Sequence, residues 1–143
     1  GIDGQQKMSK SLNNHIELAA TPAETKKRVM MMVTDPQRIH RHQPGRPEVC
    51  NVYRMHHFFS PEHIQRVHHE CTHALLGCVD DKEFLGEQIN HYLASFRQRR
   101  QEIAARPQYI DEVLDEGARR ASIIAHETMR EVKAKMGLLA RSA

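Results

Sequence analysis

The sequence is poor in the residues that build membrane spans, disulfide frameworks and aromatic surfaces. Aromatic residues make up 5% of its 143 residues and tryptophan is absent, so few rings are left to stack on the bases of a nucleic acid. No apolar run approaches the length of a membrane span and no signal peptide is visible, and we expect no membrane partner. Three cysteines are an odd number that suits no disulfide framework, which favours a reducing, cytoplasmic environment.

Strand patterns are also scarce. After residue 16 no convincing apolar alternation, internal repeat or low-complexity tract occurs. Helix signals recur instead: Thr21, Pro22 and Glu24 form the pattern of a capping box, and Gly77 and Gly137 are placed to end helices. The sequence predicts an all-α fold, a bundle of about five helices preceded by a flexible N-terminal loop. The expected helices run over roughly residues 21–33, 48–59, 61–76, 80–105 and 109–136.

The whole chain has a net charge of +3, and its surplus of basic residues lies in the first part. Residues 1–60 contain nine lysines and arginines against five acidic residues, whereas residues 61–143 contain twelve against thirteen. Eight of the eleven histidines lie between His40 and His73, where protonation below about pH 6.5 would add positive charge. A polyanionic partner fits this distribution, although so small a surplus does not demand one.

A short polar stretch, Lys7-Met8-Ser9-Lys10-Ser11, carries the strongest chemical signal. Glycines and glutamines precede it, a composition typical of an exposed loop. Two ammonium groups three residues apart, with hydroxyls beside them, can close over a polyphosphate and neutralise charge on a leaving pyrophosphate. A lysine pair alone is more often solvated surface. The whole pentapeptide, however, resembles the second signature of the class I aminoacyl-tRNA synthetases.

The rest of the chain resembles one branch of that class, the bacterial tryptophanyl-tRNA synthetases, in their C-terminal half. The motifs that carry this resemblance are Thr34-Asp35-Pro36-x-Arg38-Ile39, Pro44-Gly45-x-Pro47-Glu48-Val49-Cys50-Asn51-Val52, Gly77-Cys78-x-Asp80-x-Lys82 and Arg97-x-Arg99-Arg100. The resemblance covers essentially the whole chain. It implies an enzyme that activates tryptophan with ATP and Mg²⁺, transfers it to tRNA(Trp) and works as a homodimer.

The resemblance also implies a division of the chain. A class I synthetase places its lysine loop after a complete nucleotide-binding sheet, and neither that sheet nor a first signature of the His-Ile-Gly-His type occurs in this sequence. We therefore interpret the chain as a C-terminal fragment that is inactive alone. Residues 1–20 would be the end of the missing catalytic domain, and residues 21–143 a helical anticodon-binding domain. Subunits of the family meet largely through the catalytic domain, so a monomeric fragment is compatible with a dimeric enzyme.

Site residues follow from the same resemblance. Lys7 and Lys10 would bind the phosphates of ATP, with Lys10 contacting the transition state. Met8 would line the adenine side through its backbone, and Ser9 would hydrogen-bond a phosphate. Because the sheet and the ATP that would hold the loop are missing, we expect it to be poorly ordered.

Arginines are the candidates for tRNA contacts, because a guanidinium can pair with base edges and with phosphates. The fold is needed to decide which of them face RNA and which are solvated charges. The candidates are Arg38, Arg46, Arg97, Arg99 and Arg100.

The cysteines pose a separate question. Cys50, Cys71, Cys78 and Asp81 form the pattern C-x20-C-x6-C-x2-D. Some members of the resembled family carry a fourth cysteine in place of the aspartate, with a first spacer two residues longer, and bind a [4Fe-4S] cluster. Three interpretations stay open: an iron–sulfur cluster, a zinc site completed by a nearby histidine, or reduced cysteines packed as small apolar side chains.

Two further functions remain as alternatives to the synthetase interpretation. One is a stand-alone helical module that binds a metal or an iron–sulfur cluster. The other is a structural interaction domain without an RNA partner, which would show no tRNA binding even at low salt.

Overall fold

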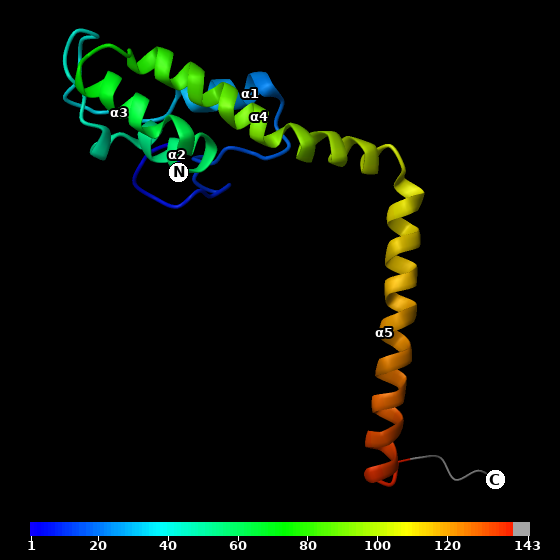
Figure 1. Ribbon diagram of the computed structural model, residues 1–143. Helices are drawn as coiled ribbons and strands as arrows, with labels where there is room; N and C mark the ends of the chain where they lie inside the picture. Colours follow the sequence, from blue (N-terminus) through cyan, green and yellow to red (C-terminus); the bar gives the residue numbers. More distant parts are fainter. Residues whose placement is uncertain (139–143) are drawn as a thin grey trace. The chain divides into compact units, whose positions relative to one another are not determined.

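The computed structural model describes residues 1–138 and confirms the all-α fold (Figure 1). Within these residues there is no strand. Two compact units form, Gly1–Gln98 and a second that begins at Arg99. The elements, in which η marks a short 3-10 helix, are α1 Pro22–Met30, η1 Pro47–Val49, α2 Asn51–Phe59, η2 Pro61–His63, α3 Ile64–Thr72, α4 Cys78–Ala104 and α5 Pro107–Lys135.

Helix α1 begins as its sequence predicts and ends earlier. The Thr21 hydroxyl accepts a hydrogen bond from the backbone N–H of Glu24 at 3.3 Å, and the Glu24 carboxylate accepts one from the Thr21 N–H at 2.7 Å. This is the expected capping box. The helix stops at Met30 instead of about residue 33, because the Val33 N–H donates to the Ile2 carbonyl at 3.0 Å and leaves the helical ladder.

Helix α1 runs antiparallel to the first part of α4 (Figure 1). Asn90 Nδ2 donates to the Pro22 carbonyl at 3.1 Å, and Lys82 Nζ donates to the Met30 carbonyl at 2.9 Å. Between these contacts lies the buried Gly86, where a Cβ would stand 3.6 Å from the Cα of Lys26. An alanine there would meet the Lys26 side chain at 3.2 Å, so a side chain that extends beyond Cβ would push the two helices apart.

The core of the first unit draws on α1, α2, α4 and the N-terminal segment. Burial of each large apolar side chain stabilises this packing by about 1.5–3 kcal/mol. Ile2 belongs to the core and Ile16 packs against it, so the polar N-terminal segment has apolar residues at both ends. The buried residues of this core cluster are Ile2, Val29, Met32, Cys50, Val52, Leu85, Ile89 and Leu93.

Helix α3 ends at Thr72 instead of about residue 76, and an alanine takes the backbone conformation that terminates it. Ala74 has φ of +58°, the left-handed conformation that commonly follows a helix end. The N–H of Leu75 then donates to the Glu70 carbonyl at 2.8 Å. The prediction that Gly77 ends this helix is wrong. Gly77 precedes α4, where a Cβ would lie 2.8 Å from the Asp80 carboxylate.

Helix α5 confirms the helix that the sequence predicts over residues 109–136. It ends at Lys135, and Gly137 follows with φ of +70° as the expected C-cap. The Leu138 N–H donates to the Lys133 carbonyl at 2.8 Å and closes the helix end. None of the helices in residues 1–138 is long and apolar enough to cross a membrane.

Candidate functional site

The segment that we call the lysine loop, residues 3–14, is closed at its base by backbone pairing. The Ile2 N–H donates to the Asn14 carbonyl at 2.8 Å, so the two ends of the loop meet. The Lys7 and Lys10 side chains are exposed, Met8 is half-buried, and the hydroxyls of Ser9 and Ser11 lie 2.8 Å apart. Both ammonium groups are therefore accessible to a phosphate from solvent. The expected poor order of the loop stays a prediction.

A buried asparagine organises the interior of the lysine loop. Asn14 Oδ1 accepts from the Ser9 N–H at 2.7 Å, and its Nδ2 donates to Asp3 Oδ2 at 2.7 Å and to the Lys7 carbonyl at 3.3 Å. The hydrogen bond from Asn14, followed by those from the N–H groups of Gln5 and Gln6, lowers the pKa of Asp3 to about 2. The Asp3 carboxylate is thus held in its charged, accepting form.

Side chains from two helices hold the ends of the lysine loop. From α1, Arg28 donates to the His15 carbonyl at 3.0 Å and to the Asn13 carbonyl at 2.6 Å. From α2, Asn51 Nδ2 donates to the Gly1 carbonyl at 2.9 Å. These hydrogen bonds join both ends of the lysine loop to the helical part of the first unit.

The three cysteines and Asp81 do converge, around a small cavity also lined by Arg38. Burial raises the pKa of the Cys50 thiol. Burial also raises the pKa of Cys71 to about 11, against the opposing effect of the Arg38 charge. Thiols with raised pKa values stay protonated at neutral pH, which disfavours nucleophilic chemistry.

The residues around this cavity do not fit a metal as they stand. Arg38 Nη1 lies 3.7 Å from the sulfur of Cys71 and 3.8 Å from that of Cys78, so a guanidinium stands where a cation would have to bind. Asp81 Oδ1 is 3.0 Å from Nε2 of the buried His56. Among residues 1–138 no group of three or more His, Cys, Asp or Glu side chains is arranged to hold a metal ion.

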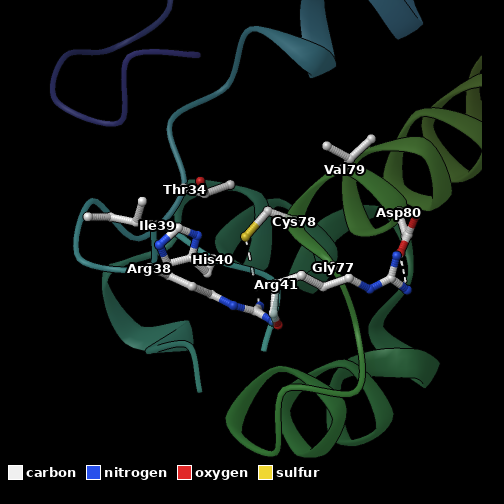
Figure 2. Close-up of a pocket in the computed structure, with 9 residues that line it drawn as sticks. All are labelled: Thr34, Arg38, Ile39, His40, Arg41, Gly77, Cys78, Val79 and Asp80. Atoms are coloured by element: carbon white, nitrogen blue, oxygen red, sulfur yellow. Dashed lines mark hydrogen bonds and ion pairs between the residues drawn. The ribbon is translucent and has the colours of Figure 1, made fainter. Parts of the chain in front are cut away.

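Arg38 also belongs to what we call the arginine loop, residues 34–46. Its Nη2 donates to the carbonyls of Arg41 and Leu76, both at 2.8 Å, while its Nε is buried without a hydrogen-bond partner in the described chain. The loop and the start of α4 enclose a cavity of about 250 Å³ (Figure 2). Arg41 borders this cavity and pairs with Asp80 at 2.9 Å, a contact that the sequence did not reveal.

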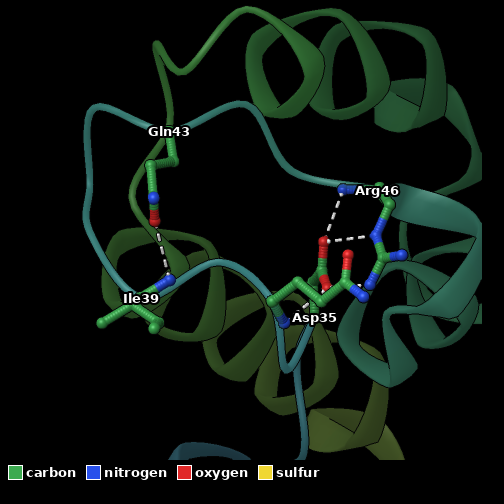
Figure 3. A network of polar contacts seen from close by, with 5 residues as sticks. Asp35, Ile39, Gln43 and Arg46 are labelled. Carbon is green, nitrogen blue, oxygen red and sulfur yellow. Dashed lines mark hydrogen bonds and ion pairs between the residues drawn. The ribbon is translucent and has the colours of Figure 1, made fainter.

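Polar contacts at two levels shape the arginine loop (Figure 3). At its base, Asp35 accepts from Arg46 Nη2 at 2.6 Å and from Arg46 Nε at 3.0 Å, and these bonds lower the pKa of Asp35 to about 2. Near its tip, Gln43 Oε1 accepts from the N–H groups of Ile39 and His40 at 2.9 and 2.8 Å. The cations of the loop are thus displayed on a braced backbone.

The five arginines expected at tRNA occupy different environments. Arg46 is paired with Asp35, as described. Arg97 donates to Thr25 Oγ1 and Asn90 Oδ1, both at 2.7 Å, and so joins α4 to α1. Arg99 and Arg100 lie exposed in the second unit, where Arg99 pairs with Glu102 at 3.2 Å. Arg38 alone of the five borders the cavity of about 250 Å³.

Sequence reasoning overlooked the residues that support the two loops. Asn14, Arg28 and Gln43 form hydrogen bonds with backbone groups that the fold brings next to them. Their role is therefore not visible in the sequence pattern. The one available signal was the position of Asn14, two residues before Ile16, a residue that packs on the core.

Comparison with known proteins gives a consistent result. Residues 1–94 match the model of the family described as tRNA synthetases class I (W and Y). The tryptophan–tRNA ligase of Aquifex aeolicus is 39% identical over 140 residues, which cover 96% of this chain and 35% of that protein. The tryptophan–tRNA ligase of Thermotoga maritima is 39% identical over 141 residues, which cover 97% and 43%.

A solved structure supports the same relationship. The crystal structure of tryptophanyl-tRNA synthetase from Campylobacter jejuni, complexed with ADP and tryptophan, matches with a TM-score of 0.85 at 30% identity. The match covers 96% of this chain and 43% of that one. The chain therefore spans less than half the length of these relatives.

Proposed function

Because this chain belongs to the class I tRNA synthetase family of the W and Y enzymes, we propose that it is the C-terminal part of a tryptophan–tRNA ligase. The observation that carries the proposal is the Lys7–Ser11 sequence on an accessible loop, in a chain of which 96% or more aligns with tryptophan enzymes. The complete enzyme would activate tryptophan with ATP, transfer it to tRNA(Trp) and act as a cytoplasmic homodimer. The chain alone would be inactive.

In this proposal the lysine loop serves the activation step. The tryptophan carboxylate attacks the α-phosphorus of ATP, tryptophanyl-adenylate forms, and the bond to pyrophosphate breaks. Lys7 and Lys10 neutralise charge on the phosphates, with Lys10 acting mainly as negative charge grows on the leaving pyrophosphate. Ser9 donates to a phosphate and the backbone of Met8 lines the adenine side, and Mg²⁺, when bound with ATP, would supply further positive charge for the phosphates. The protein contributes geometry and charge, and no covalent intermediate with the enzyme is needed.

We place the anticodon contact of tRNA(Trp) at the cavity of the arginine loop. Arg41 is exposed, and its exposed pair with Asp80 contributes about 0–1 kcal/mol, so a phosphate or base edge can replace Asp80 at low cost. Arg38 also borders this cavity, but its unpaired Nε is buried out of reach of RNA, so the contact is assigned to Arg41. Arg46 and Arg97 would act mainly through their internal bonds, and Arg99 and Arg100 as exposed phosphate contacts.

The comparisons favour the ligase over a stand-alone metal module or a structural interaction domain, because the similar proteins are ligases over nearly the whole chain. The guanidinium of Arg38 lies between the sulfurs of Cys71 and Cys78, and this position also argues against a metal-dependent function. We therefore assign no step of the reaction to an iron–sulfur cluster or to zinc.

The test is amino-acid-dependent ATP–pyrophosphate exchange by the complete protein that carries this chain. We expect exchange with tryptophan, none with tyrosine, and transfer of tryptophan to tRNA(Trp). Exchange that depends on tyrosine would move the chain to the other branch of the family. A complete protein that supports exchange with neither amino acid would refute the proposal.

A further inference from the structure

Asn14 is the one buried residue of the lysine loop, whose other residues are exposed or half-buried. Its exposed fraction is 4%, whereas Lys7 and Lys10 are exposed. We infer that Asn14 is a positioning residue, which sets the backbone on both sides of Met8 so that Lys7 and Lys10 present their ammonium groups to the phosphates of ATP. The inference rests on the proposed function of the lysine loop.

The hydrogen bonds of Asn14 account for every polar group of its side chain. The carboxamide has two N–H donors and one carbonyl acceptor. One donor goes to Asp3 Oδ2 at 2.7 Å and the other to the Lys7 carbonyl at 3.3 Å, while the carbonyl accepts from the Ser9 N–H at 2.7 Å. A buried amide that is fully paired fixes its partners in one arrangement, because any change leaves a buried group unpaired.

The positions of these partners explain why the lysines depend on them. Lys7 and Ser9 flank Met8, so the amide of Asn14 holds the peptide groups immediately before and after that residue. The side chains that act on ATP then leave a backbone whose direction is already set. Without the amide, the loop would have to be ordered each time ATP binds, and conformational entropy would be lost in that step.

The chemistry of position 14 is restrictive. An alanine removes all three hydrogen bonds. An aspartate can still accept from the Ser9 N–H, but it cannot donate to Asp3 and brings a second carboxylate against the first. Exchange of the two residues restores a donor facing an acceptor, because an asparagine at position 3 can donate to an aspartate at position 14. This exchange separates a specific hydrogen bond from a requirement for any polar residue.

The experiment compares Asn14→Ala, Asn14→Asp and the exchange variant Asp3→Asn/Asn14→Asp in the complete protein. Gln5→Ala is the matched control, since it removes an exposed amide from the same loop. We expect kcat for tryptophan-dependent ATP–pyrophosphate exchange to fall about 10- to 100-fold in both single variants, as for misplacement of catalytic groups by about 1 Å. The KM for tryptophan should stay unchanged. The exchange variant should recover part of the lost rate, because it restores the contact with position 3 but leaves the Lys7 carbonyl without its donor. Gln5→Ala should keep the wild-type rate.

A second readout needs no activity and uses this chain alone. Hydrogen exchange of the Ser9 amide should be faster in Asn14→Ala than in the wild type, and the exchange variant should restore the protection, while circular dichroism shows the same helix content in each. Unchanged Ser9 protection or unchanged kcat in Asn14→Ala would overturn the inference. If Asn14→Ala loses its helices, failure of the exchange variant to recover the rate would overturn it. Absence of activity in the wild-type protein would refute the proposed function instead. Hydrogen exchange of the Ser9 amide would still test whether Asn14 positions the loop.

Discussion

The lysine loop and the arginine loop both display exposed cations on irregular backbone, but they are held by different chemistry. The lysine loop closes around the neutral amide of Asn14, with one charged partner in Asp3. The arginine loop closes around an ion pair between Asp35 and Arg46, and a second cation, Arg38, reaches into the protein. Each loop therefore keeps its outward cations separate from the groups that brace it.

This difference suggests a division of tasks. A neutral amide brings no charge of its own to a site that must bind ATP, so the positive charge at the phosphates comes from the lysines. In the arginine loop, the Asp35 carboxylate is buried and paired, which makes the brace strong but sensitive to loss of either partner. Mutations should consequently affect rate in the first loop and stability or RNA affinity in the second.

The largest effect is expected for the cation that acts on the reaction. Lys10→Ala in the complete protein should lower the rate of adenylate formation by about 10²-fold or more, since a transition-state charge contact is lost. Stopped-flow measurement of adenylate formation checks this value. Lys26→Ala, which removes an exposed lysine that pairs with Glu87, is the control and should keep the rate. A wild-type rate in Lys10→Ala would remove the catalytic assignment.

The next effect concerns the brace of the arginine loop. Asp35→Ala leaves the N–H groups of Arg46 and Gln37 without their acceptor, so the free energy of unfolding should fall by about 2–4 kcal/mol. Urea unfolding followed by circular dichroism measures the change. Glu87→Ala, which breaks an exposed ion pair, should cost less than about 1 kcal/mol. Equal losses in both variants would show that the buried pair has no special role.

A smaller effect is expected on RNA binding. Arg41→Ala in the complete protein should weaken the affinity for tRNA(Trp) about tenfold and reduce its salt dependence by about one phosphate contact. Filter binding at several salt concentrations provides both values. Arg54→Ala, at an exposed arginine of α2 that does not line the cavity, serves as the matched control. The same affinity in wild type and Arg41→Ala would exclude the cavity as the anticodon contact.

Local signals explain the parts of the fold that the sequence predicted. The Thr21 capping box and the Gly137 C-cap lie within a few residues of the helix ends that they define, so pattern and structure agree there. The end of α3 was missed because it depends on Ala74 in a conformation that glycine usually adopts. Nothing in a single sequence marks an alanine for that role.

The candidate sites were predictable only as sets of residue types. The cysteine pattern left three interpretations open, and the structure brings the three cysteines together around one cavity. The guanidinium of Arg38 between two of them comes from a residue 33 positions away from Cys71. Arg38 and Arg97 were chosen as RNA contacts from their type, whereas the structure gives both of them internal hydrogen bonds. Long-range partners of this kind depend on how the helices pack, which periodicity does not encode.

The smallest effect is expected on stability at acid pH, through the Asp3 carboxylate of the lysine loop. The pKa of Asp3 is lowered from 3.8 to about 2, chiefly by Asn14. A lowered folded-state pKa means that the carboxylate stabilises the fold above about pH 4 and that this contribution is lost as the pH falls from 4 to 2. Direct NMR titration should place the Asp3 pKa near 2 in the wild type and in Gln5→Ala, where the backbone donor remains, and closer to 3.8 in Asn14→Ala. An unchanged pKa in Asn14→Ala would mean that the backbone donors alone hold the carboxylate, and the amide would then have no electrostatic part in shaping the loop.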